Sequence, residues 1–286
     1  MRVRSGIMVS MNRLSTEKRV RVVASLIEGN SIRATVRMTG VAKNTVTKLL
    51  VDLGAACDAY MHEVMRDLPC ERLQVDEIWA FVYSKQKNVP EERIGEYGIG
   101  DVWTYVAIDP DTKLVPAWLV GERNADDATV FLGDLKERLR NRVQLTTDGN
   151  RAYLSAVPTA FRGEIDWAVL QKIYGSDPDA ARRYSPAKCT GIVKDRMLGN
   201  PDPAHVNTSY VERQNLTMRM GMRRFTRLTN AFSKKVENLN AAVALHFMHY
   251  NFVRRHQTLK TTPAVAAGVA DHEWTLEEIV GLLDAN

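Results

Sequence analysis

Two adjacent carboxylates, Asp76 and Glu77, interrupt an otherwise apolar stretch at residues 73–82. The β-branched and aromatic residues around them predict a buried strand. Burying an unpaired carboxylate costs several kcal/mol or shifts its pKa until the group is neutral. Because successive side chains of a strand point to opposite faces, we expect Asp76 and Glu77 to serve different sites. We expect Glu77 to pair with a core arginine, whereas Asp76 needs partners from elsewhere in the chain.

Asp148 and Glu212 are the candidates to join Asp76. Asp148 ends a predicted strand and precedes Gly149, whose missing side chain lets backbone or a ligand approach closely. Ligands of open α/β sheets bind beyond the carboxyl ends of strands. Glu212 opens a predicted helix that runs at least to residue 221. Each acid also has a simpler role: Asp148 could cap the next helix, and Glu212 could form a capping box with Ser209.

Asp76, Asp148 and Glu212 would repel one another at a shared site unless cations lay between them. Hard oxygen ligands with room for water and phosphate oxygens suit Mg²⁺ or Mn²⁺. Two such ions about 3.5–4 Å apart stabilise the attacking and leaving oxygens of phosphoryl transfer. The three acids therefore predict a site for two divalent ions.

Positive charge is concentrated in two parts of the chain. Residues 1–50 hold ten Lys and Arg residues against two Glu residues, a net charge of +8, and residues 213–235 hold seven Lys and Arg residues and no acid. Clustered basic charge is the electrostatic footprint of a nucleic-acid-binding protein. The second cluster supplies Arg219, Arg223 and Arg224 as predicted DNA contacts, with Arg219 two turns beyond Glu212 on one helix face. The alternative is a solvated amphipathic helix.

Residues 15–53 predict three short helices that form a helix-turn-helix. Ser15 and Ser31 can cap the first two, and Gly40 ends the second. The third helix turns short polar and basic side chains outward, which can reach base edges and phosphates in a major groove. These predicted DNA-binding residues are Lys43, Asn44, Thr45, Thr47 and Lys48. The alternative is a three-helix bundle with a solvated third helix.

From residue 73 the hydrophobic period changes to that of strands. The predicted strands are 73–83, 103–108, 114–120, 143–147 and 165–174, and the predicted helices are 125–140 and one from about residue 151. Three strands in a meander, followed by helix, strand and helix, predict an α/β fold. This order matches the ribonuclease H-like fold, a mixed sheet with flanking helices, here preceded by a small all-α helix-turn-helix domain.

Composition excludes several other classes of protein. The three cysteines are widely spaced and odd in number, which argues against a disulfide framework and against a zinc finger. No apolar run approaches the roughly 20 residues needed to span a bilayer, and no signal-peptide core follows the first basic residues. We therefore expect a cytoplasmic protein with no membrane partner. His246 and His249 lie three residues apart in an apolar run, where packing is favoured over a zinc site.

Three separated stretches carry the acidic residues: VDEIW at 75–79, TTDG at 146–149 and YVERQN at 210–215. They resemble the three motifs of DDE transposases, most closely those of the bacterial family of insertion sequence one. The stretch YNFVRRH at 250–256 is similar to that family's C-terminal signature, and CER at 70–72 to the residues before its first motif. The resemblance covers roughly residues 70–268. The chain lacks the cysteine zinc finger that some members carry at the N-terminus.

The resemblance implies a catalytic triad of Asp76, Asp148 and Glu212 that holds two Mg²⁺ or Mn²⁺ ions. Asp76 would bridge both ions, the other two acids would hold one each, and Arg219 would contact the transposon end. The implied activity is strand cleavage at the element's ends and one-step transfer of the freed 3′-hydroxyl to target DNA. The implied partners are double-stranded DNA, both terminal inverted repeats and target, and further copies of the chain, as a homodimer or higher oligomer on the bacterial nucleoid.

These observations divide the chain into four predicted segments. They are a helix-turn-helix DNA-binding domain at 1–56, a helical linker at 57–70, a ribonuclease H-like DDE catalytic domain at 71–260 with an insertion around 175–206, and a C-terminal helical tail at 261–286. Two alternatives to a transposase stay open from the residues alone. One is a non-catalytic DNA-binding regulator derived from a decayed transposase, and the other is a structure-specific nuclease on the same fold.

Overall fold

The computed structural model describes residues 13–175, 189–226 and 230–284. The first 12 residues of the predicted DNA-binding domain and residues 176–188 of the predicted insertion lie outside this range. Three helices open the described chain: α1 (Thr16–Ile27), α2 (Ile32–Thr39) and α3 (Lys43–Val64). The predicted caps are confirmed, since Ser15 accepts a hydrogen bond from the backbone of Lys18 and Ser31 from that of Ala34. Gly40 ends α2 with a φ of 69°.

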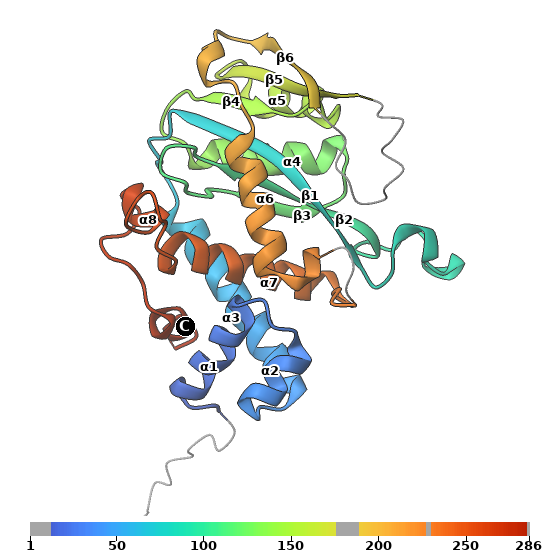
Figure 1. Cartoon of the computed structure of the whole chain (residues 1–286), viewed down its shortest axis with the longest axis vertical. Helices are drawn as coiled ribbons and strands as arrows, with labels where there is room; N and C mark the ends of the chain where they lie inside the picture. Colours follow the sequence, from blue (N-terminus) through green and yellow to red (C-terminus); the bar gives the residue numbers. More distant parts are fainter. Residues whose placement is uncertain (1–12, 176–188, 227–229, 285–286) are drawn as a thin grey trace, which may run out of the picture.

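Six strands form one mixed sheet (Figure 1). They are β1 (Arg72–Val82), β2 (Gly100–Ile108), β3 (Trp118–Gly121), β4 (Gln144–Thr147), β5 (Asp166–Tyr174) and β6 (Cys189–Leu198), in the order β3-β2-β1-β4-β5-β6. Strands β4 and β5 run parallel to β1, and β2, β3 and β6 are antiparallel to their neighbours. A meander joined at its first strand to a parallel pair is the ribonuclease H-like topology, so the predicted fold class is confirmed.

Helices cover both faces of the sheet. Helices α4 (Ala125–Arg138) and α5 (Ala152–Phe161) pack on one face, and α6 (Ser209–Gly221) crosses β1 on the other (Figure 1). The remaining helices are α7 (Val236–Met248), α8 (Pro263–Ala266) and α9 (Leu276–Gly281), with a π-helical turn at His249–Val253. Single 3₁₀ turns lie at Gln86–Asn88, Glu91–Arg93, Pro203–His205 and Arg223–Phe225. None of the helices in the described ranges is long and apolar enough to cross a membrane.

The predicted strand 114–120 is wrong in its first half, because β3 begins only at Trp118. The buried side chain of Asn251 explains the difference. Its Oδ1 accepts a hydrogen bond from the N–H of Val115, and its Nδ2 donates to the carbonyl of the same residue, each at 3.0 Å. A side chain from the far end of the sequence thus takes both backbone groups that a longer strand would pair.

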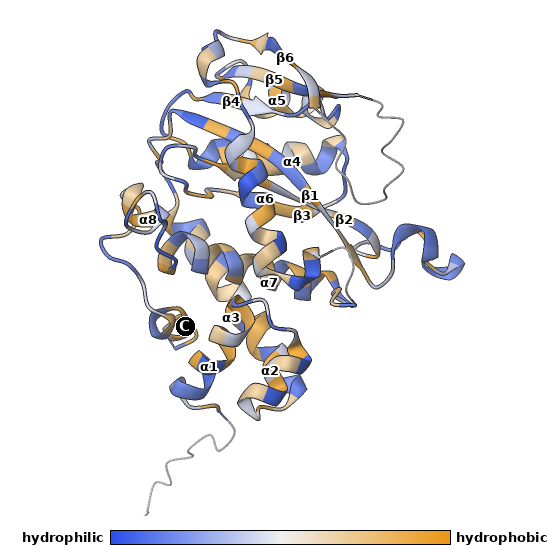
Figure 2. Cartoon of the chain, viewed as in Figure 1, coloured by the Kyte–Doolittle hydropathy of each residue, from blue (hydrophilic) through white to orange (hydrophobic). Residues whose placement is uncertain are grey.

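Helix α3 belongs to the main hydrophobic core along much of its length. Its residues Leu53, Cys57 and Met61 are buried in the same cluster as β1. Where α3 crosses α7, Gly54 lies directly against Ala241, with no space for a side chain between them. The predicted linker is therefore helical as far as Val64, and one face of it is buried in the core. Figure 2 shows that α3 carries many hydrophobic residues, whereas the connection between β1 and β2 is mostly hydrophilic. The division into four domains stays a prediction.

His246 and His249 lie at the C-terminal end of α7. Burial lowers the pKa of His246 to about 3 and that of His249 to about 4, so both rings are neutral at pH 7. The ring of His246 meets that of Phe247 edge-on, with centroids 5.3 Å apart. The C-terminal helix α9 begins with a capping box of Thr275 and Glu278 and packs against α1.

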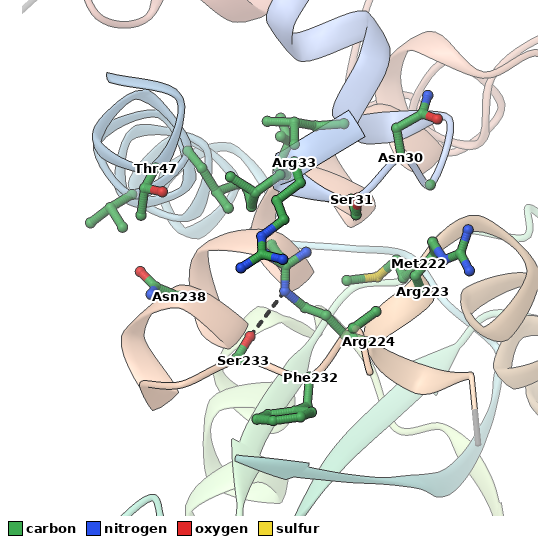
Figure 3. A pocket seen from close by; sticks show the side chains of 18 of the residues that line it. Asn30, Ser31, Arg33, Thr47, Met222, Arg223, Arg224, Phe232, Ser233 and Asn238 are labelled. Carbon is green, nitrogen blue, oxygen red and sulfur yellow. Dashed lines mark hydrogen bonds between the residues drawn. The ribbon is translucent and has the colours of Figure 1, made fainter. Parts of the chain in front are cut away.

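A cavity of about 1310 Å³ separates the three N-terminal helices from the segment that joins α6 to α7 (Figure 3). The crossing of α3 and α7 lies beside this cavity, since Leu50 and Val51 of α3 and Ala242 of α7 line it. The close packing of α3 and α7 at Gly54 therefore affects both the packing of the core and the shape of the cavity.

Gly54→Ala is expected to lower the free energy of unfolding by about 1–3 kcal/mol, the usual effect of overpacking a core. The added methyl group would lie 2.4 Å from the Cα atom of Ala241, so the two helices must move apart. Gly133→Ala in α4 is the matched control, because no atom lies within 4 Å of its added carbon. That variant should gain roughly 0.5–1 kcal/mol through helix propensity. Urea denaturation checks both, and equal stabilities of the two variants would contradict the close packing.

Candidate active site

The central strand β1 extends beyond the end of its parallel neighbour β4. The last paired residues are Val75 of β1 and Thr147 of β4. Asp76 and Glu77 lie on β1 just past this point, and Asp148 begins the loop that follows β4. One carboxylate oxygen from each of these three acids lies within 4.8 Å of the other two. The structure thus gathers three acidic side chains at one open position of the sheet.

The expectation that Asp76 and Glu77 serve different sites is wrong. Their side chains do find partners on opposite faces of the sheet, as strand geometry requires. Asp148, however, lies beyond the end of β4, where no strand separates the two faces on that side of β1. A carboxylate at this position approaches both side chains, which brings Glu77 into the same acidic group.

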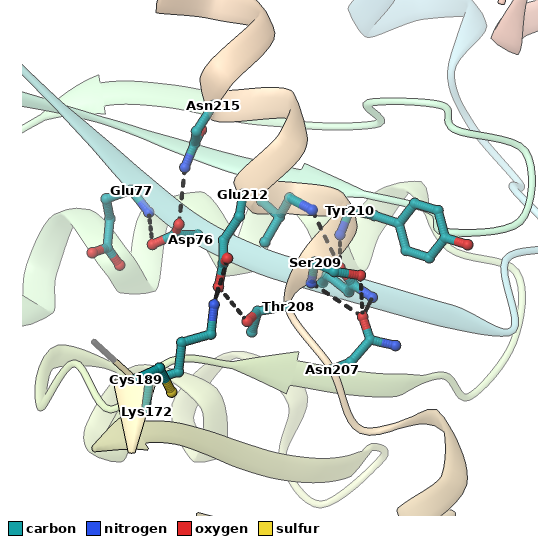
Figure 4. Close-up of polar contacts among 12 residues, drawn as sticks. Asp76, Glu77, Lys172, Cys189, Asn207, Thr208, Ser209, Tyr210, Glu212 and Asn215 are labelled. Atoms are coloured by element: carbon teal, nitrogen blue, oxygen red, sulfur yellow. Dashed lines mark hydrogen bonds and ion pairs between the residues drawn. The ribbon is translucent and has the colours of Figure 1, made fainter. Parts of the chain in front are cut away.

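Asp76 is held by two hydrogen bonds (Figure 4). Its Oδ1 accepts from the backbone N–H of Glu77 at 2.8 Å, and its Oδ2 accepts from Nδ2 of Asn215 on α6 at 2.9 Å. The pKa of Asp76 is raised to about 7, first by burial and then by the charge of Asp148. Glu77 and Glu212 add smaller effects in the same direction. A cation that binds beside this carboxyl group would favour its charged form, and the proton would be released to solvent.

Glu77 is the best-compensated of the three acids. Its side chain accepts hydrogen bonds from Nε of Arg123 at 3.3 Å and from Nδ2 of Asn150 at 3.0 Å. The guanidinium of Arg123 also stacks on Trp103, 4.6 Å from the ring centroid, and lies 3.9 Å from Asp148. Pairing of Glu77 with an arginine is confirmed, although Arg123 is 40% exposed and not part of the core. Burial, followed by the charge of Asp148, raises the pKa of Glu77.

Glu212 lies near this acidic group but outside it. Both of its carboxylate oxygens contact Nζ of Lys172 on β5 at 2.5 Å, and Oγ1 of Thr208 donates to one of them at 2.7 Å (Figure 4). Partial burial is the largest single effect on Lys172 and lowers its pKa, but the hydrogen bond with Glu212 and the charge of Glu212, with smaller effects of other groups, together raise the lysine pKa. The structure thus brings Asp76 and Asp148 together and places Glu212 beside them, engaged by a lysine.

Gln74 fixes the start of helix α6 over β1. It precedes Asp76 by two residues, so the two side chains share one face of the strand. Its Oε1 accepts from the backbone N–H groups of Tyr210 and Val211 at 2.9 and 3.2 Å. Its Nε2 donates to Oδ1 of Asn207 at 2.8 Å. One buried side chain therefore serves as a long-range cap of α6 and sets where Glu212 falls.

The alternative in which Ser209 and Glu212 form a capping box is not observed. The helix begins at Ser209 itself, with Thr208 at the N-cap position and no capping bond from its side chain. Because Gln74 takes the N–H groups of the first turn, the carboxylate of Glu212 is left to face Thr208 and Lys172.

Sequence reasoning missed five side chains around the acids: Gln74, Arg123, Asn150, Lys172 and Asn215. Two of them carried a usable signal. Gln74 lies two residues before Asp76 in a strand, and Asn215 lies three residues after Glu212 in a helix, so each shares a face with a predicted acid. The other three come from separate elements, and no local spacing connects them to the acids.

The predicted DNA-binding residues occupy two surfaces. On α3, Lys43, Asn44, Thr45 and Lys48 are exposed and Thr47 is half-buried. Beyond α6, Arg223 is exposed, whereas Arg219 and Arg224 are half-buried. Thr47 and Lys48 have partners within α3, the carbonyl of Lys43 and the carboxylate of Asp52. Binding of DNA by these residues stays a prediction.

Comparison with known proteins gives structural likenesses only. No protein-family model matches the chain, and no curated protein matches its sequence. Among solved structures, the chain is similar to the piggyBac transposase in a synaptic complex with hairpin DNA, with a TM-score of 0.43 and 9% identity over 99% of this chain and 73% of that chain. It is also similar to a chain of a pre-cleavage Mos1 transpososome, with a TM-score of 0.28 and 12% identity over 83% of this chain and 78% of that chain.

The raised pKa of Asp76 predicts an unusual pH dependence of stability. A carboxyl whose pKa rises from 3.8 to about 7 on folding binds its proton more tightly in the folded state. In EDTA, the wild-type free energy of unfolding should therefore contain a component that declines between about pH 4 and pH 8. Asp76→Asn should remove that component, because the amide does not titrate and Asn215 can turn its own amide to match. Urea denaturation of both proteins across this range is the measurement, and parallel curves would contradict the assignment.

Proposed function

We propose that the chain is a DNA transposase of an insertion sequence, which cleaves DNA at the element's ends and joins them to target DNA with divalent metal ions. The proposal depends chiefly on one observation: Asp76 and Asp148 meet where β4 ends, with Glu212 beside them on α6. The ribonuclease H-like sheet and the three motifs that resemble DDE transposases support the same function. Asp76, Asp148 and Glu212 are its proposed catalytic residues.

The donor atoms around Asp76 fit a hard divalent cation. Asp76, Glu77 and Asp148 offer only carboxylate oxygens, and their mutual repulsion and burial already raise the pKa of two of them. Oxygen donors of this kind suit Mg²⁺ or Mn²⁺. In the proposed site Asp76 would serve both of two ions, with Asp148 and Glu212 holding one each. Bound ions would neutralise charge that develops on the attacking and leaving oxygens of a phosphodiester.

The chain's own residues prepare this site. The backbone of Glu77 and the amide of Asn215 fix the orientation of Asp76. Arg123 contacts both Glu77 and Asp148, which limits their repulsion without neutralising Asp76. Preorganised ligands of this kind cost little reorganisation when a cation binds. The proposed DNA partners are the terminal inverted repeats and the target duplex, and binding of two ends favours a homodimer or higher oligomer on DNA.

Asp76→Asn, Asp148→Asn and Glu212→Gln should each reduce Mg²⁺-dependent DNA cleavage by more than about 100-fold, because even outer-shell partners of metal ligands are worth 10- to 100-fold. The substrate is an end-containing duplex taken from the DNA that flanks the gene, and strand cleavage is followed on a denaturing gel. Glu164→Gln is the control, since this exposed acid pairs with Lys136 at the surface.

Three results would count against the transposase. Wild-type activity in Asp148→Asn would remove that residue from the site and contradict the proposed catalytic triad. DNA binding by the wild-type chain with no cleavage of its own ends would instead favour the regulator. Cleavage of branched DNA without joining would favour a structure-specific nuclease.

Lys172 is expected to compete with metal for Glu212. Lys172→Gln removes a cation 2.5 Å from that carboxylate, so Mn²⁺ should bind several-fold to about tenfold more tightly. Electron paramagnetic resonance of free Mn²⁺ gives the affinity without reference to activity. Lys194→Gln on β6, where the ammonium donates to the carbonyl of Pro203, is the matched control. Weaker Mn²⁺ binding in Lys172→Gln would show that the lysine supports the site instead of competing for it.

A further inference from the structure

The cavity beside α3 has two walls that come from distant parts of the sequence. One wall is formed by residues 29–33, at the start of α2, and by the first three turns of α3. The other is formed by residues 221–224 and 230–238, between α6 and α7. Its volume of about 1310 Å³ is well beyond that of a packing defect. The contacts of the acidic site do not involve it, so it needs a separate explanation.

Both walls are basic. Six positively charged residues line the cavity and, within the described part of the chain, have no hydrogen bond or ion pair beyond those named in this subsection. They are Arg33, Lys43, Lys48, Arg224, Lys234 and Lys235. Among the described lining residues, Asp52 is the single acid, and it pairs with Lys48 at 2.6 Å. Within the described ranges, no carboxylate lies at ion-pair distance from the other five cations. The cavity therefore holds a large uncompensated positive charge.

Two of these cations face each other across the cavity. In Figure 3 the guanidinium groups of Arg33, from α2, and Arg224, from the opposite wall, extend toward one another. Arg224 donates to Oγ of Ser233 at 2.9 Å and has no acidic partner in the part of the chain described here. Burial lowers the pKa of Arg224 to about 10, which still leaves it charged. Two facing guanidinium groups repel each other unless an anion lies between them.

Two helix N-termini add to the positive field. Helix α3 begins after Ala42 and helix α7 after Lys235, and neither has a side-chain cap. Residues of both first turns line the cavity, Asn44 from α3 and Asn238 from α7. Backbone N–H groups at an uncapped N-terminus favour phosphate oxygens, and the helix dipole strengthens this preference.

We propose that this cavity is a groove for the sugar–phosphate backbone of DNA, clamped between α3 and the α6–α7 connection. The cations are spread along both walls and do not converge on one point, which suits a polyanion better than a small anion. The same groove presents Asn44 and Thr47, two predicted base-reading side chains, to the strand that it holds. The inference depends on the proposed function and adds Arg33, Lys234 and Lys235 to the DNA-binding residues.

The salt dependence of DNA binding tests the groove. Each phosphate contact contributes about 0.9 to the slope of log affinity against log salt concentration. Lys234→Gln with Lys235→Gln should therefore reduce the slope by about 2, and Arg33→Gln, on the opposite wall, by about 1. Fluorescence anisotropy with the full chain and a labelled random-sequence duplex gives the slopes. These exposed side chains are not needed for folding, and denaturation curves of each variant verify that.

Arg162→Gln is the matched control, because this exposed arginine ends α5 on the other side of the sheet. Its slope should equal that of the wild type. Unchanged slopes in all groove variants, with normal wild-type binding, would reject the groove and leave the transposase proposal to the cleavage assay. Wild-type binding that is absent or independent of salt would overturn the groove, and wild-type binding without cleavage of the element's own ends would separately count against the proposed function.

Discussion

The early end of β4 is the constraint on which the acidic site depends. Strand β1 continues past Val75 without a neighbour on that side, so the space next to Asp76 and Glu77 is left to a loop. Asp148 enters that space, and three buried or half-buried carboxylates then face one another. Their repulsion explains why the surrounding side chains are amides and cations. Asn150 and Arg123 satisfy Glu77, while Asp76 receives donors too weak to neutralise it.

Much of the fold follows from local patterns in the sequence. Caps at Ser15, Ser31 and Thr275, and the change of hydrophobic period near residue 73, suffice to predict most helices and strands. The sequence could not reveal the relative lengths of neighbouring strands or the register in which they pair. Whether Glu77 joins Asp76 depends on the residue at which β4 stops beside β1, which no pattern within either strand encodes. The shortened β3 has the same origin, because Asn251 arrives from 136 residues away.

The pairing of Glu212 with Lys172 was unpredictable for a related reason. These residues come from α6 and β5, and their meeting depends on where the cap from Gln74 sets the start of α6. The predicted triad thus stands as two acids in contact and a third held alongside by a lysine. Lys172 supplies a positive partner for this carboxylate, which is 41% exposed. In the proposed site a bound cation would compete with Lys172 for Glu212.

Helix α3 runs unbroken for 22 residues, from the basic groove into the main core. A single helix about 33 Å long therefore belongs to both regions. The close contact between Gly54 and Ala241 packs α3 tightly against α7. Helix α7 also carries part of the opposite wall of the groove. The width of the groove is thus set by helix packing in the interior of the protein. A ligand too wide for the groove would therefore have to separate the closely packed backbones of α3 and α7, and movement of side chains at the rim would not be enough.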